Sequence, residues 1–372
     1  MTATRPCVLI LGVPPERVDD VRAAIGAPQR RARHAGAQVE FSLSVDTAAA
    51  HAQAGTQLRL EMLRGPIARL FELARHWQRE FGLTLRGHEP SAEPATALAS
   101  DDAPTVVRGW IAATLPALLR ELTLLADGSD SADTLHQTRV ALRRLRTVLR
   151  LGRPCGVALD DAWEPQLAQA FRALSATRDR DALLEWLPPA LQAAGLAMPA
   201  LPPATATRAP AAVAGDPTLH GALLSLLQFA LASRPAGAGD FVHRAGRYVR
   251  RLHARIARDA RHFAALSAPR QHTLRKRVKR LRYAVEYCAE RMPAKPLRRH
   301  LRTLRAAQVA LGRLQDIAVA SELLRPRAAH DPVAARALEW LQHEMRRAVR
   351  RSAKALQRVD APPRLQQARP AS

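Results

Sequence analysis

The spacing of apolar residues divides the chain into a short strand-containing region and a long helical region. From residue 105 onward, apolar side chains recur at intervals of three and four, for example at Leu142, Leu145 and Leu149. This is the period of one face of an α-helix. Residues 1–60 instead contain the apolar runs CVLILGV and VEFSLSV, which predict strands, followed by an amphipathic helix in GPIARLFELARHWQREF. The pattern predicts a mainly α protein with a small α+β region at its N-terminus.

Two stretches without a regular period separate these parts. Residues 88–104 and 197–217 are rich in Pro, Ala and small polar residues, a composition typical of linkers. We therefore expect an α+β region at 1–90, helical bundles at 105–196 and 218–358, and a flexible tail at 359–372.

The helical part contains an internal repeat. The segment LHQTRVALRRLRTVLRL (135–151) matches QHTLRKRVKRLRYAVEY (271–287), and LSATRD, ending at Asp179, matches LGRLQD, ending at Asp316. Two independent matches at nearly the same offset indicate a duplication. Since each half contains about four helical segments, the repeat predicts two similar, pseudo-symmetric four-helix bundles.

The repeated helix carries a line of basic side chains on one face. In the first copy the line is His136, Arg139, Arg143 and Arg146, and in the second it is His272, Arg275, Lys279 and Arg282. A neighbouring apolar line fixes each helix in its bundle, so the basic face must look outward or into a groove. Like charges one turn apart repel by a few tenths of a kcal/mol, so the arrangement favours a ligand that supplies negative charge.

Two further basic rows follow the same spacing. The first row is Arg244, Arg247 and Arg251 and continues to Arg258. The second row is Arg298, Arg302 and Arg305. Only two acidic residues, Asp240 and Asp259, lie among residues 240–285. A solvated face is the ordinary explanation of an arginine-rich helix, but the recurrence in both halves favours a surface that binds a polyanion. We take both rows and both lines as the candidate site.

The net charge lies almost wholly in the C-terminal part of the chain. The total is +24, and residues 201–372 hold 34 basic against 11 acidic side chains. The preference for Arg over Lys is explained by a GC-rich coding sequence, but a local surplus of basic residues is not. Such a surplus indicates a polyanionic partner, whether a nucleic acid, an acidic membrane surface or another phosphate polymer.

The cysteines and the apolar runs indicate in which cellular compartment the protein is expected. Cys7, Cys155 and Cys288 are far apart and lack CxxC spacing, which argues against a disulfide framework and a zinc site. No run of 18 apolar residues occurs, so we expect neither a signal peptide nor a membrane span. We expect a cytoplasmic protein.

The two histidines and the two aspartates have different expected roles. The histidines follow candidate N-caps, Ser131 or Asp133 in the first copy and Ser267 in the second, where exposed N–H groups favour phosphate. Asp316 shares a helical face with Arg298, Arg302 and Arg305, so we expect it to orient a guanidinium rather than to bind a metal.

The repeated motifs resemble those of the CHAD domain, the conserved histidine α-helical domain, over residues 105–358. Both halves have the His-x-x-Arg start, the KRLRY-like centre and the downstream aspartate. The resemblance implies two four-helix bundles related by pseudo-twofold symmetry, and a basic groove that binds inorganic polyphosphate. Carried over by motif, its residues are the two lines from His136 and His272, whereas the rows around Arg247 and Arg302 rest on charge and spacing alone.

The N-terminal region resembles part of a CYTH domain, the triphosphate tunnel fold that often precedes a CHAD domain. The catalytic glutamate-x-glutamate-x-lysine signature would fall near Pro6, Val8 and Ile10, where the sequence has no charge. The resemblance therefore implies a degenerate, non-catalytic remnant.

Three classes of function compete at this point. Polyphosphate binding leads, because aromatic residues make up only 4% of the chain and single-stranded nucleic acid is usually held by base stacking. Non-specific binding of DNA or RNA is the alternative, since a basic groove also attracts phosphodiesters. Enzymatic phosphoryl transfer normally needs Mg²⁺ on clustered carboxylates, so we expect no catalytic residue, no metal and no cofactor. Association with polyphosphate granules is a further expectation, and the oligomeric state stays open.

Overall fold

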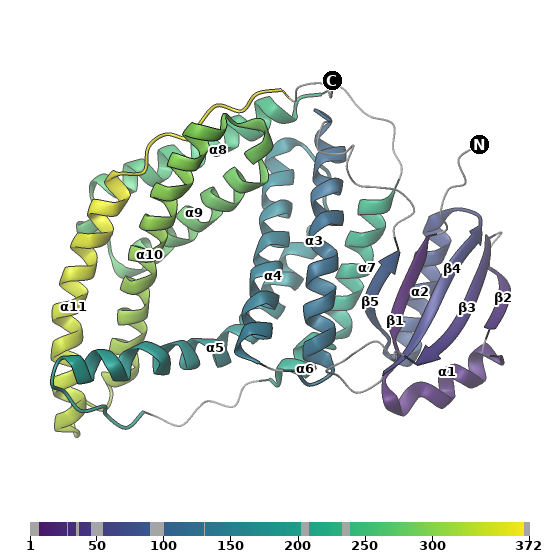
Figure 1. Ribbon diagram of the computed structural model, residues 1–372, viewed down its shortest axis with the longest axis horizontal. Coiled ribbons are helices and arrows are strands. Elements are labelled where there is room, and N and C mark those ends of the chain that lie inside the picture. Colours follow the sequence, from purple (N-terminus) through teal and green to yellow (C-terminus); the bar gives the residue numbers. More distant parts are fainter. Residues whose placement is uncertain are drawn as a thin grey trace. The chain divides into compact units, whose positions relative to one another are not determined.

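The computed structural model describes most of the chain and divides it into two compact units. The described residues are 7–27, 29–34, 37–45, 55–89, 100–129, 131–201, 208–232 and 239–367, with the side chains of residues 34, 45, 89 and 175–182 not described. Unit 1 comprises residues up to 176 together with 207–239, and unit 2 comprises 177–206 and 240–371. The protein is mainly α-helical, as the sequence predicts, with its strands confined to the N-terminal region (Figure 1).

The strands of unit 1 form one antiparallel sheet. Among the described residues it has five strands in the order β2-β3-β4-β1-β5. Their bounds are β1 Val8–Gly12, β2 Gln29–His34, β3 Ala37–Val45, β4 Thr56–Arg64 and β5 Thr84–Glu89. The strands predicted from CVLILGV and VEFSLSV are thus confirmed as β1 and β3.

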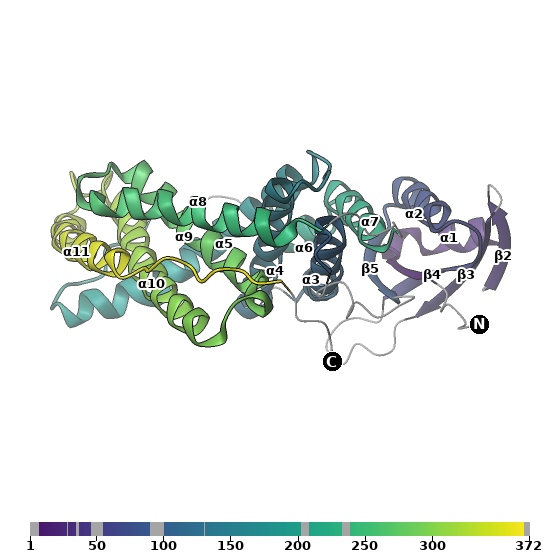
Figure 2. The ribbon, with the colours of Figure 1, turned by 90° about the horizontal axis from the view of Figure 1, so that it is seen from above.

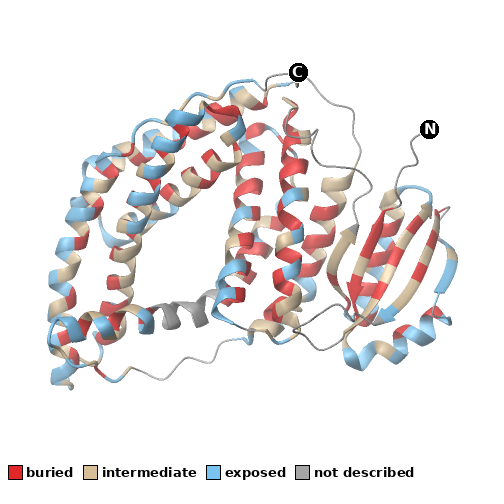
Figure 3. Ribbon diagram, in the orientation of Figure 1, coloured by how far each residue is buried: buried red, intermediate tan, exposed pale blue. Residues whose placement is uncertain are grey.

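One face of the sheet is packed, and along β3 and β4 the other face is polar. Along β4 buried Leu58, Leu60 and Met62 alternate with less buried residues, as expected where only one face meets a core. The helices α1 (Val18–Ile25) and α2 (Ile67–Phe81) belong to this region, and Trp77 of α2 lies 5.5 Å from Phe41 of β3. Figure 3 shows the alternation of burial along the strands.

The edge strand β2 is not predicted by the apolar pattern. Its sequence QRRARH contains no large apolar residue, because it lies at the edge of the sheet. Charged side chains at such an edge oppose pairing with another chain. Arg31 of β2 pairs with Glu40 of β3 at 3.1 Å.

The helices of unit 1 pack against each other and against the sheet. They are α3 Ala103–Ala126, α4 Ala132–Gly152, α6 Pro210–Ala214, α7 Pro217–Leu231 and the first part of α5 Trp163–Ala193. α3 contacts α4, α7 and β5, and α7 contacts α2. By length and composition α3 could span a membrane, but over half of its most apolar window is buried, as in the core helix of a bundle.

The boundaries of the units differ from those expected. α7 falls within the expected second bundle but belongs to unit 1, because its apolar residues, among them Leu223 and Leu227, are buried there. The second expected linker contains α6, and the first overlaps β5, while residues 90–99 and 202–207 lie outside the described residues. The three cysteines are buried.

A buried histidine connects α7 to the sheet. The Nδ1 atom of His220 accepts a hydrogen bond from the backbone N–H of Leu85 at 3.0 Å. Its Nε2 atom lies 2.6 Å from the carbonyl oxygen of Ala214, to which it therefore donates. Burial lowers the pKa of His220 to about 4, so the ring is neutral and holds both bonds.

Unit 2 is a helical bundle with the end of α5 packed on it. Its helices are α8 Phe241–Arg261, α9 Ala268–Tyr287, α10 Ala294–Leu324 and α11 Pro332–Gln357. α10 contacts α9 and α11, and α8 contacts α9 and α11. Arg313 of α10 stacks on Trp186 of α5, with the guanidinium 3.9 Å from the ring centre.

The segment after α11, expected as a flexible tail, lies against unit 2 over residues 359–367. Val359 is buried, and its carbonyl oxygen lies 3.2 Å from the Nε2 atom of His253. The N–H of Gln366 donates to the carbonyl oxygen of Arg291 at 2.8 Å, and Arg299 pairs with Asp360 at 3.1 Å. Residues 368–372 lie outside the described part of the chain.

Candidate functional site

The first basic line begins at a capped helix N-terminus. The hydroxyl of Ser131 accepts a hydrogen bond from the N–H of Thr134 at 3.1 Å, which confirms Ser131 rather than Asp133 as the N-cap. His136 lies in the second turn of α4 and is exposed. In the second copy Ser267 occupies the N-cap position of α9 without a side-chain hydrogen bond.

The rest of the first line is half-buried against α5. The guanidinium groups of Arg139, Arg143 and Arg146 lie 5.0, 5.4 and 5.4 Å from the ring centre of Phe171. Arg139 also donates to the carbonyl oxygen of Leu174 at 3.0 Å. Cation–π contact and this hydrogen bond orient three cations along one helix. Contacts with α5 thus fix the side chains of Arg139 and Arg143. The spacing of residues in the sequence does not indicate these contacts.

Glu164 supplies negative charge at the far end of this line. Its carboxylate pairs with Arg146 at 2.9 Å and with Arg150 at 2.5 Å. Burial alone would raise the pKa of Glu164, but the charges and hydrogen bonds of Arg150 and Arg146 lower it. Burial lowers the pKa of Arg146. The charge of Arg146, a predicted binding residue, is therefore balanced by the carboxylate of Glu164. His136, at the other end of the line, is exposed.

The second line is half-buried on the side of α9 that faces α10. The Nδ1 atom of His272 lies 2.6 Å from the Oε1 atom of Gln315, so the ring donates to the amide oxygen. Arg275 and Lys279 follow on the same face and are half-buried. Arg282 covers the ring of Tyr283 at 4.6 Å and pairs with Glu286 at 3.4 Å.

The row on α10 lies next to this second line. Arg298, Arg302 and Arg305 are exposed, and Arg305 approaches Glu286 of α9 to 3.9 Å. The structure therefore brings together the line from His272 and the row from Arg298, as two adjacent basic strips on unit 2. Gln315, which orients His272, was not singled out in the sequence, although it directly precedes Asp316 in the repeated LGRLQD motif.

The row on α8 lies elsewhere. The packing between α8 and α9 includes the ion pair of Asp259 with Arg277. Arg277 lies about 140–160° around α9 from His272 and Lys279 at 100° per residue. α8 therefore packs on the side of α9 opposite to the second line. Arg247 and Arg251 are exposed and Arg244 pairs with Asp240 at 2.6 Å. This row therefore lies apart from the second line, and its binding of a polyanion stays a prediction.

The aspartates of the repeated motif are only partly defined. Burial lowers the pKa of Arg313, and the negative charge of Asp316 partly offsets this effect by raising it. This fits the expected role of Asp316 in orienting a guanidinium. The side chain of Asp179 lies outside the described residues. Within the described part of the chain, no group of three or more His, Cys, Asp or Glu side chains could hold a metal ion.

Comparison with known proteins shows which family the chain resembles. The family model described as the CHAD domain matches residues 109–325. The crystal structure of the CHAD domain from the plant Ricinus communis is similar, with a TM-score of 0.57 and 26% sequence identity, covering 75% of this chain and all of that one. The search of curated proteins found no significant match.

Proposed function

Because the chain belongs to the CHAD domain family, we propose that it binds inorganic polyphosphate through the basic residues of its repeated helices. The proposed site comprises the two basic lines and the row on α10. Its members are His136, Arg139, Arg143, Arg146, His272, Arg275, Lys279, Arg282, Arg298, Arg302 and Arg305.

One observation carries the proposal: in both units the basic line is held in place by contacts with the following long helix. Arg139 of the first line donates to the carbonyl oxygen of Leu174 in α5, and His272 of the second line donates to Gln315 in α10, at different positions of the repeat. Side chains that are already oriented lose little conformational freedom on binding a ligand. A solvated basic face has no need of such contacts.

The chemistry of the lines favours a polymer of phosphates without bases. Guanidinium groups match phosphate oxygens in a bidentate geometry. The described aromatic rings at the lines, Phe171 and Tyr283, are engaged by arginines, so they do not offer a free face to a base. Base stacking on aromatic rings usually contributes about 1–3 kcal/mol per base. Non-specific nucleic-acid binding is the alternative that this site supports next.

The proposal further places the protein in the cytoplasm, in contact with polyphosphate-containing granules, as a binding protein rather than an enzyme. The resemblance of the N-terminal region to a CYTH remnant belongs to the same proposal. Val8 is buried and Ile10 is half-buried in β1, at two positions where the catalytic signature would need charge.

Neutralising the lines tests the proposal. We expect Arg139→Gln, Arg143→Gln, Arg275→Gln and Lys279→Gln together to abolish most of the affinity of the full-length protein for polyphosphate. With about eight phosphate contacts, log K should fall with log salt with a slope of about −5 to −6, and with four contacts the slope should be about −3. Fluorescence anisotropy of end-labelled polyphosphate over a salt series measures both quantities.

A matched variant separates the site from net charge. Arg346→Gln, Arg347→Gln, Arg350→Gln and Arg351→Gln remove the same charge from exposed positions of α11, and the salt slope should stay near that of the wild type. Equal losses in the two variants would reject the site. Competition with single-stranded DNA at equal phosphate concentration decides between the two ligands, since the alternative requires DNA to compete as well as polyphosphate.

A further inference from the structure

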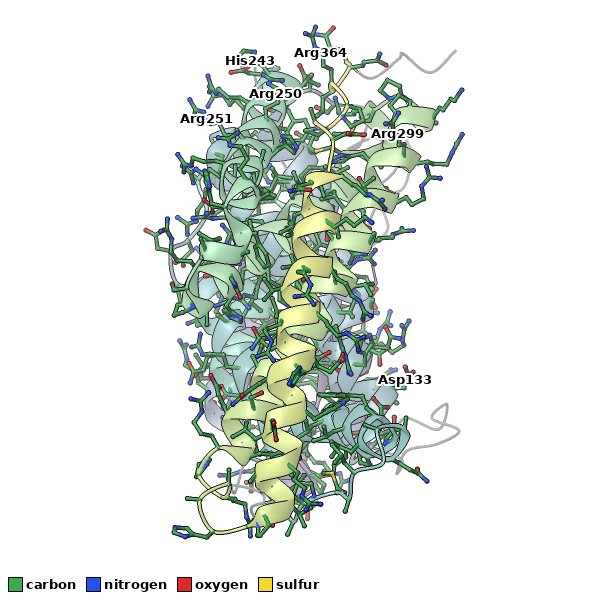
Figure 4. The ribbon with its side chains drawn as sticks, turned by 90° about the vertical axis from the view of Figure 1, so that its left-hand side faces the viewer. Asp133, His243, Arg250, Arg251, Arg299 and Arg364 are labelled. Atoms are coloured by element: carbon green, nitrogen blue, oxygen red, sulfur yellow. The ribbon has the colours of Figure 1, made fainter. Side chains whose placement is uncertain are left out.

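The outer face of α8 consists almost entirely of arginine. Its exposed residues, apart from His243 and Ala254, are all arginines: Arg247, Arg250, Arg251, Arg255, Arg258 and Arg261. At 1.5 Å per residue, they extend over about 21 Å. Figure 2 shows α8 on the outside of its bundle, and Figure 4 shows Arg250 and Arg251 projecting away from the ribbon.

No acidic side chain on this helix is available to neutralise these arginines. Of the two acids described within or next to α8, Asp240 pairs with Arg244 and Asp259 pairs with Arg277 of α9. Neighbouring arginines at intervals of three and four therefore repel one another. Such a face is stabilised by an external polyanion.

The arginine face is not a requirement of the repeated fold. α3 precedes α4 as α8 precedes α9, but α3 is covered by α7 and β5, and its exposed residues are Ala113, Pro116 and Arg120. α11 also has a basic exposed face, yet that face includes Glu339 and Gln342. On α8, unlike on α11, the exposed residues include no acid, and all of them except His243 and Ala254 are arginines.

α8 and the second line lie on opposite sides of α9. Arg277 of α9 meets α8, whereas His272 meets α10. A helix with its side chains is about 10–12 Å across, which is comparable with the Debye length of about 8 Å at physiological salt. A ligand at one surface is therefore largely screened from the charges of the other.

We propose that the outer face of α8 is a second polyphosphate-binding surface, so that one molecule bridges two polyphosphate chains. This inference rests on the proposed function, which assigns the first chain to the basic lines. The α8 face offers no exposed Phe, Tyr or Trp ring for stacking on a base, and its single exposed imidazole, His243, lies in the first turn. It also offers no large apolar side chain for insertion into a membrane, because Val249, Leu252 and Ile256 are buried in the core. A linear polymer of phosphates matches its charge and its length.

Energy transfer between two labelled chain populations tests the bridge. One population of short polyphosphate carries a donor fluorophore and the other an acceptor, and both are mixed with the full-length protein. We expect the wild type to bring the two labels together. The variant Arg247→Gln, Arg251→Gln, Arg255→Gln and Arg258→Gln should lose this energy transfer but retain its affinity for a single chain at limiting polymer within about threefold, because the surfaces are screened from each other.

The α11 variant with Arg346, Arg347, Arg350 and Arg351 replaced by Gln is the charge-matched control, and it should keep the energy transfer. Circular dichroism reports whether the fourfold α8 variant is folded. If that variant does not fold, the double variant Arg251→Gln and Arg255→Gln takes its place and should lose part of the energy transfer.

Each outcome assigns the failure to one proposal. If the wild type binds no single chain, the proposed function fails. If it binds one chain without energy transfer, or if the α8 variant bridges as well as the wild type, the second surface is rejected and the first stands. If the α8 variant still bridges but loses binding to vesicles with anionic lipids, α8 is a membrane-contacting surface and the inference is wrong.

Discussion

At the scale of single residues, His220 shows how a polar group can be buried without instability. Its two ring nitrogens are both satisfied, by the N–H of Leu85 and the carbonyl oxygen of Ala214. A protonated ring would have to donate from both nitrogens, so the bond from Leu85 would be lost. Burial and the bond accepted from Leu85 thus select the neutral form, and folding of unit 1 becomes sensitive to acid.

We expect His220 to destabilise the folded protein as the pH falls from about 6.5 to about 4. Its pKa is lowered in the folded state from the ordinary value of 6.5 to about 4, so its contribution is fully present above pH 6.5. A shift of this size corresponds to a loss on the order of 3 kcal/mol in the free energy of unfolding. Urea denaturation at pH 7 and at pH 4 measures it.

The variant His220→Gln should be less stable than the wild type at pH 7 but should lose less stability at pH 4. His330→Gln, at an exposed position, is the control and should behave as the wild type. An equal dependence on pH in the wild type and in His220→Gln would contradict the assignment.

At the scale of elements, the two repeated helix pairs differ in how their basic lines are compensated. α5 presents Phe171 and Glu164 to the line of α4, whereas α10 presents Gln315 to the line of α9 and adds three exposed arginines beside it. One duplicated motif thus yields a partly neutralised strip in unit 1 and a more positive strip in unit 2.

Removing the carboxylate of Glu164 should lower stability and raise affinity. Glu164→Gln leaves half-buried Arg146 without its ion pair, and we expect unfolding to become easier by about 1–2 kcal/mol, since the pair is partly exposed. The freed charges of Arg146 and Arg150 should strengthen polyphosphate binding. Chemical denaturation and fluorescence anisotropy measure the two effects, and Glu339→Gln, at an exposed position of α11, should change stability little. A weaker affinity in Glu164→Gln would contradict the view that Glu164 neutralises part of the site.

At the scale of the whole molecule, the N-terminal sheet is part of a compact unit with helices rather than a separate appendage. α7 contacts α2, and α3 contacts β5. Gln78 of α2 donates to the carbonyl oxygen of Pro217 at 2.9 Å, and Arg86 pairs with Asp127 at 2.6 Å. The bundle of unit 1 therefore has no complete core without the sheet.

Deleting residues 1–99 should consequently unfold or loosen unit 1 while unit 2 stays helical. Each large apolar side chain uncovered on α3 and α7 costs about 1.5–3 kcal/mol, so several of them together exceed the stability of about 5–15 kcal/mol that is usual for a domain. We expect the fragment to bind a hydrophobic dye and to lose part of its cooperative thermal transition, as followed by circular dichroism. A fragment with a full helical content and no dye binding would show that the helices fold without the sheet.

The sequence by itself determined the helices, the strands with apolar runs and the repeat. These features depend on local periodicity, because residues three or four apart share a helical face whatever the rest of the fold does. The basic lines of α4 and α9 follow from the same rule, whereas the sequence left the N-cap of α4 open between Ser131 and Asp133. β2 was missed because an edge strand buries little, so its sequence carries no apolar alternation.

Only the tertiary structure decided which elements pack together and which charges are compensated. α7 belongs to unit 1 because its apolar side chains are buried against α3 and α2, and no local pattern names those partners. Glu164 of α5 pairs with Arg146 of α4, and Arg277 of α9 pairs with Asp259 of α8. Neither pairing between two helices can be read from the spacing of residues in the sequence. The α8 row was predicted together with the α9 line because both have helical spacing. Spacing places residues on the face of their own helix, but the direction of that face in space is set by long-range packing.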